Sequence, residues 1–481
     1  MTKADTADIR QLSRTLEAVG QQHVLKFWGD LSGESRARLV SQVEALDLDG
    51  LPGLINEYVK NKPAAAIPHK IDPAPYFPYD PLSKFRHWDK ASYKAAGESL
   101  LRRGKVAAFT VAGGQGSRLG FEGPKGMFPA GAVTGKTLFA FFAEGILAAT
   151  RRYGAIVPWY IMTSPLNHEA TVEYFEKNRF FGLDPQDVMF FPQGVMPSFE
   201  MGTGRILLAA KDELATNPDG HGGSLKALFT SGAIDDMRER EVQHISYFQV
   251  DNPLVKVVDP VFLGLHASAP ESSGEMSSKM IPKTGPEEKL GVFCSVNGRV
   301  EVIEYSDLPV ELSKQRLPDG SLKFLAGSIA VHALSVEFVA RLNTDSQFSL
   351  QYHRAEKKIP HIDLATGRLV QPDANNGIKL ERFVFDALPM CRASIVYETS
   401  RADEFAPIKN ATGVDSVESS KKIQTIRAAA WLEAAGVKMP RDAKGEPECV
   451  VELSPLTAME PVDLKGAKLP GKVERGAKVA I

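Results

Sequence analysis

The sequence has few cysteines and no long hydrophobic run. Its 481 residues include only Cys294, Cys391 and Cys449. An odd number of widely spaced cysteines fits no zinc pattern and argues against a disulfide framework. No apolar run is long enough to cross a bilayer, and the first thirty residues lack the core of a secretory signal. These absences predict a soluble protein of a reducing cytoplasm, with no membrane partner.

An excess of charge of either sign is also missing. The 57 Lys and Arg residues balance 59 Asp and Glu residues, for a net charge of −2. This balance predicts neither a nucleic-acid surface nor a polybasic membrane patch. The 43% hydrophobic and 24% charged residues are typical of globular proteins, and the length allows two or three domains.

The hydrophobic pattern changes along the chain. Residues 8–60 show helical periodicity, and six prolines between residues 62 and 81 predict an extended connector. Four apolar runs then alternate with helical stretches such as 138–150 and 169–178; the runs cover residues 106–112, 158–163, 188–191 and 245–250. Apolar strands alternating with helices predict a parallel sheet covered on both faces.

Beyond Asp251 the pattern becomes antiparallel. Asn297-Gly298 separates two strand-like runs, and this dipeptide favours the type I′ turn of a hairpin. Residues 417–435 predict a helix that ends at Gly436, and short strand-like segments follow Cys449.

A glycine-rich loop follows the first predicted strand. Residues 112–120 read Ala-Gly-Gly-Gln-Gly-Ser-Arg-Leu-Gly, and Pro124-Lys125-Gly126 comes soon after. Glycines let backbone N–H groups approach phosphate oxygens, and Arg118 and Lys125 add full positive charges. The loop lies at the carboxyl end of a strand, where ligands of such sheets bind. This pattern predicts a polyphosphate site, since a plain strand-to-helix turn would not explain the two cations.

Two better-known glycine loops do not fit. The dinucleotide fingerprint G-x-G-x-x-G is excluded because Gly114, Gly116 and Gly120 are spaced one residue too long. Residues 131–137 resemble a P-loop, but the first glycine comes one position late and no apolar strand precedes it. We interpret Gly135-Lys136-Thr137 as the approach to a helix.

Residues 113–120 together with 124–126 resemble the signature of eukaryotic-type UDP-N-acetylhexosamine pyrophosphorylases, members of the UTP:sugar-1-phosphate uridylyltransferase (UDP-sugar pyrophosphorylase) family. Further matching motifs follow in the family's order, at residues 22–28, 162–164, 180–183, 218–223, 250–252, 304–306, 376–379, 383–386 and 407–410. The resemblance implies an α/β fold with a Rossmann-like nucleotidyltransferase core built on a mixed, mostly parallel sheet. It implies a helical N-terminal domain with connector (1–100), a catalytic domain (101–410) and a small C-terminal α+β domain (411–481).

The reaction implied by the resemblance joins UTP to a sugar 1-phosphate and gives a UDP-sugar and pyrophosphate, with a divalent cation. Such chemistry needs positioning and charge neutralisation more than proton transfer. Asp251, at the end of an apolar run, is the expected Mg²⁺ ligand, because this hard cation prefers oxygen; the alternative is a cap or turn aspartate.

The resemblance also assigns roles to single residues. Arg118 is expected to receive the leaving pyrophosphate through its planar guanidinium, and Lys125 to meet the α-phosphate. Lys409 is a phosphate contact on the resemblance alone. Gln193 can donate to and accept from the imide edge of uracil. The complete expected nucleotide-binding set is Ala112, Gly113, Gly114, Gln115, Gly116, Gln193 and Gly220.

The sugar pocket is expected to include carboxylate, amide and aromatic side chains. Phe383 and Phe385 occupy alternating positions of a predicted strand, a pattern more typical of core than of a pocket. The expected sugar-binding residues are His221, Gly291, Glu304, Tyr305, Ser328, Asn376, Lys379 and Phe383.

Two positions depart from the acetylhexosamine pattern. His221 and Ser328 stand where that family has sugar-contacting asparagines, and such exchanges can change specificity strongly. The Gly-Gly-Gln-Gly loop is nevertheless of the acetylhexosamine type. The sequence therefore favours N-acetylglucosamine 1-phosphate, with glucose 1-phosphate or a broad range of sugars as the alternative.

Two other functional classes remain open. A nucleotide-sugar-binding regulator would have kept the fold and lost catalysis. A glycosyltransferase would normally carry an Asp-x-Asp pair at its metal, whereas Asp235 and Asp236 are adjacent and lie on a predicted helix.

Overall fold

The computed structural model describes residues 3–62, 70–345 and 350–481. Contacts between residues divide the chain into two compact units. The smaller unit comprises Met1–Ala66, Gly194–Gly223 and Ser349–Val384, and the larger comprises Ile67–Gln193, Ser224–Phe348 and Phe385–Ile481. The predicted boundaries at residues 100 and 410 stay a prediction.

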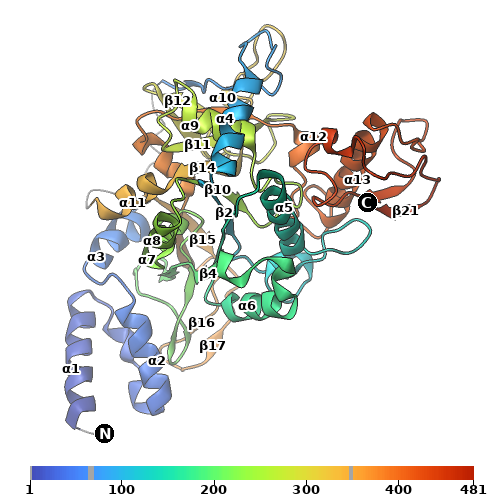
Figure 1. The fold of residues 1–481 in the computed structure, drawn as a ribbon. Helices are drawn as coiled ribbons and strands as arrows, with labels where there is room; N and C mark the ends of the chain where they lie inside the picture. The colour runs from blue at the N-terminus through green and yellow to red at the C-terminus, as the bar shows by residue number, and fades with distance from the viewer. Residues whose placement is uncertain (1–2, 63–69, 346–349) are drawn as a thin grey trace. The chain divides into compact units, whose positions relative to one another are not determined.

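Four parallel strands form one half of the main sheet in the larger unit. They lie in the order β10 (His244–Gln249), β2 (Val106–Val111), β3 (Trp159–Thr163) and β4 (Val188–Pro192). Helices α5 (Leu138–Tyr153), α6 (His168–Lys177), α7 (Gly223–Thr230) and α8 (Ala233–Glu239) occur between these strands in the sequence (Figure 1). Strand β3 is buried along its whole length, as a strand covered on both faces must be. The predicted alternation of strands and helices is confirmed.

The other half of the sheet is antiparallel. Strand β14 (Ala326–Ser335) pairs with β10, with His244 opposite Ser335, and also with β11 (Met276–Pro282) and β12 (Val292–Val296). Strand β13 (Arg299–Ile303) pairs with β12, β1 (Asp72–Pro73) completes that edge, and β19 (Val396–Glu398) runs parallel to β11. The described residues thus give a ten-stranded sheet, which confirms the expected mixed sheet; it is parallel only in part. The sheet changes from parallel to antiparallel at β10, and Asp251 follows that strand closely.

The predicted hairpin at Asn297-Gly298 is confirmed. Asn297 has φ of 51° and Gly298 has φ of 80°, and a type I′ turn requires positive φ at both positions. The five residues of β12 pair in register with those of β13, from Val292 opposite Ile303 to Val296 opposite Arg299.

Helices cover the larger unit and continue into its C-terminal part. Helix α4 (Lys90–Arg102) packs beside α9 (Pro260–Ser268), as Figure 1 shows. Three further helices are α10 (Val310–Ser313), α11 (Val336–Thr344) and α12 (Arg401–Glu404). Helix α13 (Val417–Ala434) begins at a capping box formed by Ser416 and Ser419 and packs against the parallel pair β20 (Val450–Glu452) and β21 (Lys478–Ala480).

The smaller unit combines N-terminal helices with short strands from two distant segments. Its helices are α1 (Lys3–Ala18), α2 (Gly33–Glu44), α3 (Leu51–Leu54) and a π-helix over Ile55–Lys60, which confirms the helical prediction. Its strands are β5 (Val195–Pro197), β6 (Phe199–Glu200), β7 (Leu208–Ala210), β8 (Glu213–Leu214), β9 (Thr216–Pro218), β15 (Tyr352–Lys357), β16 (His361–Ile362), β17 (Leu369–Val370) and β18 (Gly377–Arg382). One core joins Leu16 and Leu39 of the helices to Phe199 and Ile378 of the strands.

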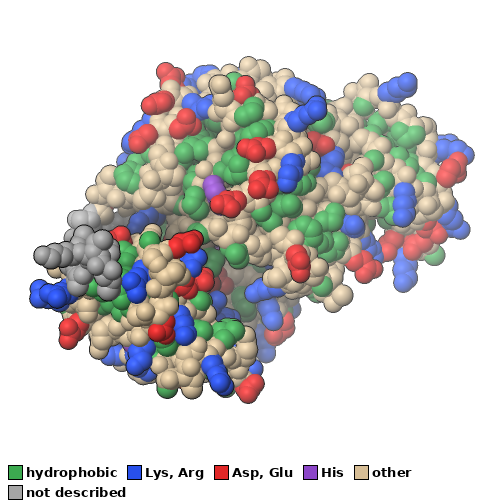
Figure 2. All heavy atoms as spheres, turned by 90° about the horizontal axis from the view of Figure 1, so that it is seen from below, with side chains coloured by type: hydrophobic (Ala, Val, Ile, Leu, Met, Phe, Trp, Pro, Cys, Tyr) green, Lys and Arg blue, Asp and Glu red, His purple; other side chains and the backbone are tan. Residues whose placement is uncertain are grey.

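The surface mixes charges of both signs. On the face shown in Figure 2, basic and acidic side chains are interspersed, and neither sign forms a continuous field there. Within the described ranges, no helix combines the length and apolarity that a membrane crossing would need.

Candidate active site

The glycine loop closes on itself and returns Lys125 to the end of β2. The Gly116 N–H donates to the Gly123 carbonyl over 3.0 Å, and the Lys125 N–H donates to the Gly114 carbonyl over 3.0 Å. Gln115 and Pro124 form a β-bridge between these two bonds. This closure explains why a lysine eleven positions after Gly114 still belongs to the same site.

Gln193 lies against the glycine loop. It follows β4, is 6% exposed, and donates its N–H to the Thr163 carbonyl over 2.8 Å. A Cβ atom added at Gly113 would lie 2.4 Å from Gln193 Oε1, whereas one added at Gly114 would meet no atom within 4 Å. The Gln193 side chain thus occupies the space beside Gly113, and the predicted loop and uracil residues come together.

Asn167 positions the loop and was missed by the sequence reasoning. Its side chain is 1% exposed, and Nδ2 donates to the carbonyls of Ala112 over 3.0 Å and of Gly114 over 3.4 Å. Its Oδ1 accepts from the Ser164 N–H over 2.7 Å. The sequence signal that could have identified Asn167 was its position directly before α6, soon after the matched motif at residues 162–164.

Four predicted charged residues form one electrostatic cluster. Lys125 Nζ lies 3.9 Å from Asp251 Oδ2, and the two side chains are only 16% and 15% exposed. The Ile408 N–H donates to the Asp251 carbonyl over 2.8 Å, which brings Lys409 to the same place. Arg118, exposed on the short helix Ser117–Leu119, is also close enough to act on Lys125.

The surroundings of Lys125 disfavour its own positive charge. Burial lowers the pKa of Lys125, the neighbouring Lys409 and Arg118 lower it further, and Asp251 opposes them. Three cations held this close repel one another, so an anion entering among them relieves that repulsion. The cluster is suited to bind several phosphate charges at once.

Three predicted sugar residues of the larger unit lie together at the antiparallel strands: Ser328 on β14, Gly291 just before β12 and Glu304 just after β13. The Ser328 N–H donates to the Gly291 carbonyl over 2.8 Å. A Cβ atom at Gly291 would lie 3.0 Å from Glu304 Oε1, so glycine there makes room for this carboxylate. Tyr305 follows in the chain and is 48% exposed.

In the smaller unit, His221 stacks on Phe383. Their ring centroids are 5.0 Å apart, and His353 stacks on Phe383 at 4.0 Å. The Val384 N–H donates to His221 Nδ1 over 3.1 Å, so the neutral ring carries its proton on Nε2. Burial lowers the pKa of His221 to about 4, which keeps the ring neutral near pH 7.

The prediction that Phe383 and Phe385 occupy alternating strand positions is wrong. Strand β18 ends at Arg382, whose N–H donates to the Asp219 carbonyl and whose carbonyl accepts from the Gly222 N–H, over 2.8 Å each. These bonds use the backbone groups that a continuing ladder would need. Phe385 instead lies in a short helix over Val384–Met390.

The remaining predicted site residues of the smaller unit contact neighbouring backbone groups or lie on a strand. Gly220 has φ of 83°, and a Cβ atom there would lie 2.3 Å from the Arg382 carbonyl oxygen. The Asn376 side-chain amide accepts from the Ile359 N–H over 2.7 Å and donates to the Ile359 carbonyl over 3.0 Å. Lys379 lies on β18 opposite Ala355. Contacts of these residues with a base or sugar stay predictions.

The two alternative motifs have structural roles. Thr137 caps α5, and Lys136 Nζ lies 2.6 Å from Glu144 Oε2, which confirms that residues 135–137 approach a helix. Asp235 and Asp236 lie on α8 as predicted, and Asp236 pairs with Arg240 over 3.0 Å.

A cation site would have to use few protein ligands. Across the residues described by the structure, no group of three or more His, Cys, Asp or Glu side chains could hold a metal ion. Asp251 offers one carboxylate, and Mg²⁺ is usually bound by one or two carboxylates together with substrate phosphates. Asp251 therefore fits a magnesium site that the substrates would complete.

Comparisons with known proteins agree with this geometry. The family model described as UTP–glucose-1-phosphate uridylyltransferase matches residues 53–452. The chain is 34% identical to the human UDP-N-acetylhexosamine pyrophosphorylase-like protein 1, covering 92% of this chain and 91% of the relative. It is 33% identical to the UDP-N-acetylglucosamine pyrophosphorylase of Saccharomyces cerevisiae, covering 87% and 90%.

A solved structure has the same fold over nearly the whole length. It is the uridine diphosphate N-acetylglucosamine pyrophosphorylase of Trypanosoma brucei in complex with an inhibitor, with a TM-score of 0.77, 26% identity and coverage of 98% of both chains. The chain therefore belongs to the UTP–glucose-1-phosphate uridylyltransferase family and is an enzyme of the uridylyltransferase, or UDP-sugar pyrophosphorylase, type.

Proposed function

We propose that this protein transfers the uridylyl group of UTP to N-acetylglucosamine 1-phosphate and releases pyrophosphate. The observation that carries the proposal is the clustering of Lys125, Asp251, Arg118 and Lys409 beside the glycine loop. The names of the relatives from Saccharomyces cerevisiae and Trypanosoma brucei support the choice of sugar.

The proposed chemistry is a displacement at the α-phosphorus of UTP. A phosphate oxygen of the sugar 1-phosphate attacks that phosphorus, and its bond to the oxygen bridging to the β-phosphorus breaks. Lys125 stabilises the charge that grows on the α-phosphate, and Arg118 binds the departing pyrophosphate. Lys409 holds a further phosphate. No proton needs to move, so these residues act by position and charge.

Magnesium is the proposed cofactor, with Asp251 as its protein ligand. Apart from the ion pair with Lys125, the Asp251 carboxylate makes no side-chain hydrogen bond within the described ranges, so it has acceptor capacity for a cation. When bound, Mg²⁺ would neutralise phosphate charge. Lys125 Nζ lies 3.9 Å from this carboxylate, which is too far for a hydrogen bond.

One observation favours glucose 1-phosphate as a second candidate. His221 carries its proton on Nε2 and therefore offers one donor, whereas the asparagine that it replaces would offer a donor and an acceptor. A pocket that lacks this amide would discriminate less strongly for an acetamido group. A broad UDP-sugar specificity is the corresponding wider alternative.

A panel of sugar 1-phosphates with pyrophosphate release as the readout tests the proposal. N-acetylglucosamine, glucose and galactose 1-phosphates would each be assayed with UTP and Mg²⁺, and ATP would replace UTP as a control. We expect the highest kcat/KM with N-acetylglucosamine 1-phosphate. A higher value with glucose 1-phosphate would select the second candidate. No release with any sugar, combined with tight UDP-sugar binding, would favour a regulator instead.

A further inference from the structure

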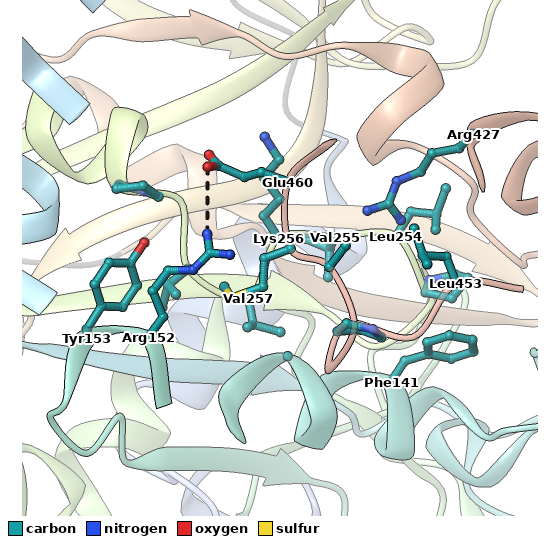
Figure 3. Close-up of a pocket in the computed structure, with 17 residues that line it drawn as sticks. Phe141, Arg152, Tyr153, Leu254, Val255, Lys256, Val257, Arg427, Leu453 and Glu460 are labelled. Carbon is teal, nitrogen blue, oxygen red and sulfur yellow. Dashed lines mark ion pairs between the residues drawn. The ribbon is translucent and has the colours of Figure 1, made fainter. Parts of the chain in front are cut away.

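A pocket lies in the larger unit beside the segment that follows Asp251. Residues 253–258 form one wall, α5 and α13 form others, and residues 453–460 close it (Figure 3). Its charged lining residues are Arg152, Lys256, Arg427 and Glu460. The lining thus brings three cations together with one carboxylate.

Arg427 is a partly buried cation without a hydrogen-bonded partner among the described residues. Its guanidinium lies over the Trp431 ring, 4.1 Å from the centroid, and its Nε is buried and unbonded. No described residue gives it a hydrogen bond or an ion pair, and Figure 3 shows its nitrogens directed into the pocket. Burial lowers the pKa of Arg427 to about 10, an effect that Asp403 and Glu404 oppose from a distance.

Both of those carboxylates are engaged elsewhere. Asp403 Oδ1 accepts from Trp431 Nε1 over 3.0 Å. Glu404 binds Lys279 through both oxygens, over 2.6 and 2.8 Å. A guanidinium stacked on an aromatic ring keeps its in-plane N–H donors, and these donors match the oxygens of a phosphate.

The other cations of the pocket have carboxylate partners. Burial opposes the charge of Lys256, but the carboxylates of Asp259 and Glu404 outweigh it and raise its pKa. Lys256 Nζ has its nearest carboxylate, Asp259 Oδ2, at 4.0 Å, and that oxygen is held by Lys279 at 2.8 Å. Arg152 lies 3.6 Å from Glu460, which also pairs with Lys94 over 2.7 Å. Arg152 pairs with Asp463 as well. Among the cations that the structure describes in this lining, Arg427 is therefore the one without an ion pair, and Lys256 is paired only at 4.0 Å.

We infer that this pocket binds a phosphate group, either as inorganic phosphate or as a small phosphate monoester. Arg427 and Lys256 supply the charge and the donors, and Phe141, Leu254 and Leu453 provide an apolar wall for an organic substituent. The site is separate from the catalytic cluster, and its occupancy does not depend on the proposed reaction.

The pocket is linked to the catalytic cluster through the chain. Residues 253–258 begin two positions after Asp251, and α13 begins eight positions after Lys409. Asn252 is fixed between them, because its Nδ2 donates to the Glu404 carbonyl over 2.6 Å. A ligand in the pocket would therefore contact the two segments that position Asp251 and Lys409.

Calorimetric titration of the full-length chain tests the inference. An Arg118→Met background weakens phosphate binding at the catalytic cluster, and Arg427→Met or Lys256→Met is then added. Lys422→Met serves as the matched control, since this lysine lies on α13, pairs with Glu446 and does not line the pocket. We expect either pocket variant to raise the Kd for inorganic phosphate about tenfold and the control to leave it unchanged. Equal Kd values in Arg427→Met and Lys422→Met, or no binding by the parent, would overturn the inference.

Two further experiments, a crystal soak and a titration with a second ligand, complete the test. If Arg427→Met does not fold, crystals of the parent soaked in sodium selenate should show an anomalous peak within hydrogen-bonding distance of Arg427, and its absence would overturn the site. Phenyl phosphate distinguishes the two ligand sources. Tighter binding than inorganic phosphate supports the site with a monoester as ligand, and equal binding supports it with free phosphate.

Discussion

Lys125 Nζ and Asp251 Oδ2 face each other at 3.9 Å, one from the end of the closed glycine loop and the other from the end of β10. The Lys136–Glu144 pair nearby is much closer, at 2.6 Å. A loose pair keeps both groups available to other partners. We interpret this spacing as a site in which Lys125 meets phosphate and Asp251 meets a cation when substrates bind.

Asp251→Asn should weaken the dependence on magnesium most. Asparagine keeps the size and one oxygen but removes the charge that a hard cation prefers. We expect the Mg²⁺ concentration at half-maximal rate to rise about tenfold or more, measured by pyrophosphate release. Asp235→Asn, on an exposed part of α8, is the control. A larger effect from Asp235→Asn would point to an aspartate pair of the glycosyltransferase kind.

Asn167→Asp should impair binding of UTP rather than of the sugar phosphate. Aspartate cannot donate to the carbonyls of Ala112 and Gly114, so the loop loses both restraints. We expect the KM for UTP to rise about tenfold while the KM for the sugar 1-phosphate changes less than about twofold. Asn178→Asp, just past the end of the same helix, controls for general destabilisation. Equal increases in both KM values would mean that Asn167 has only a structural role.

Acid should destabilise the fold through the histidine on β10. His244 packs edge-on against His266, and burial lowers the pKa of His244 to about 4. The unfolded chain binds a proton near pH 6.5 and the folded chain does not, so stability is lost as the pH falls from about 6.5 toward 4. We expect the free energy of unfolding to drop by about 1–2 kcal/mol per such histidine between pH 7 and pH 5. Urea titrations of the wild type and His244→Gln should differ in this slope, and identical slopes would contradict the assignment.

The local sequence pattern predicted the part of the fold that positions the phosphates. The apolar runs match β2, β3, β4 and β10 to within one or two residues, because largely buried strands such as β2, β3 and β10 leave a clear hydrophobic signal. The two cations behind the loop were identified by their spacing. The proposed roles of Arg118 and Lys125 still await kinetic measurement.

Other features depend on contacts that no local pattern records. Ile378 of β18 pairs with Phe199 of β6, nearly 180 residues earlier. The local sequence pattern therefore could not predict which segments form the smaller unit. The alternation of Phe383 and Phe385 suggested a strand, but backbone bonds to Asp219 and Gly222 end it at Arg382. Asn167 looked like an ordinary residue before a helix because its partners in the glycine loop lie over fifty positions away.

The most direct test of the account is the rate of pyrophosphate release by Lys125→Met beside Lys136→Met. Both variants remove one lysine charge near the glycine loop, but Lys136 pairs with Glu144 and lies outside the proposed cluster. We predict that Lys125→Met lowers kcat about 100- to 1000-fold with unchanged folding, and that Lys136→Met changes it less than about threefold. A Lys125→Met enzyme that keeps a kcat similar to that of Lys136→Met would contradict the central claim.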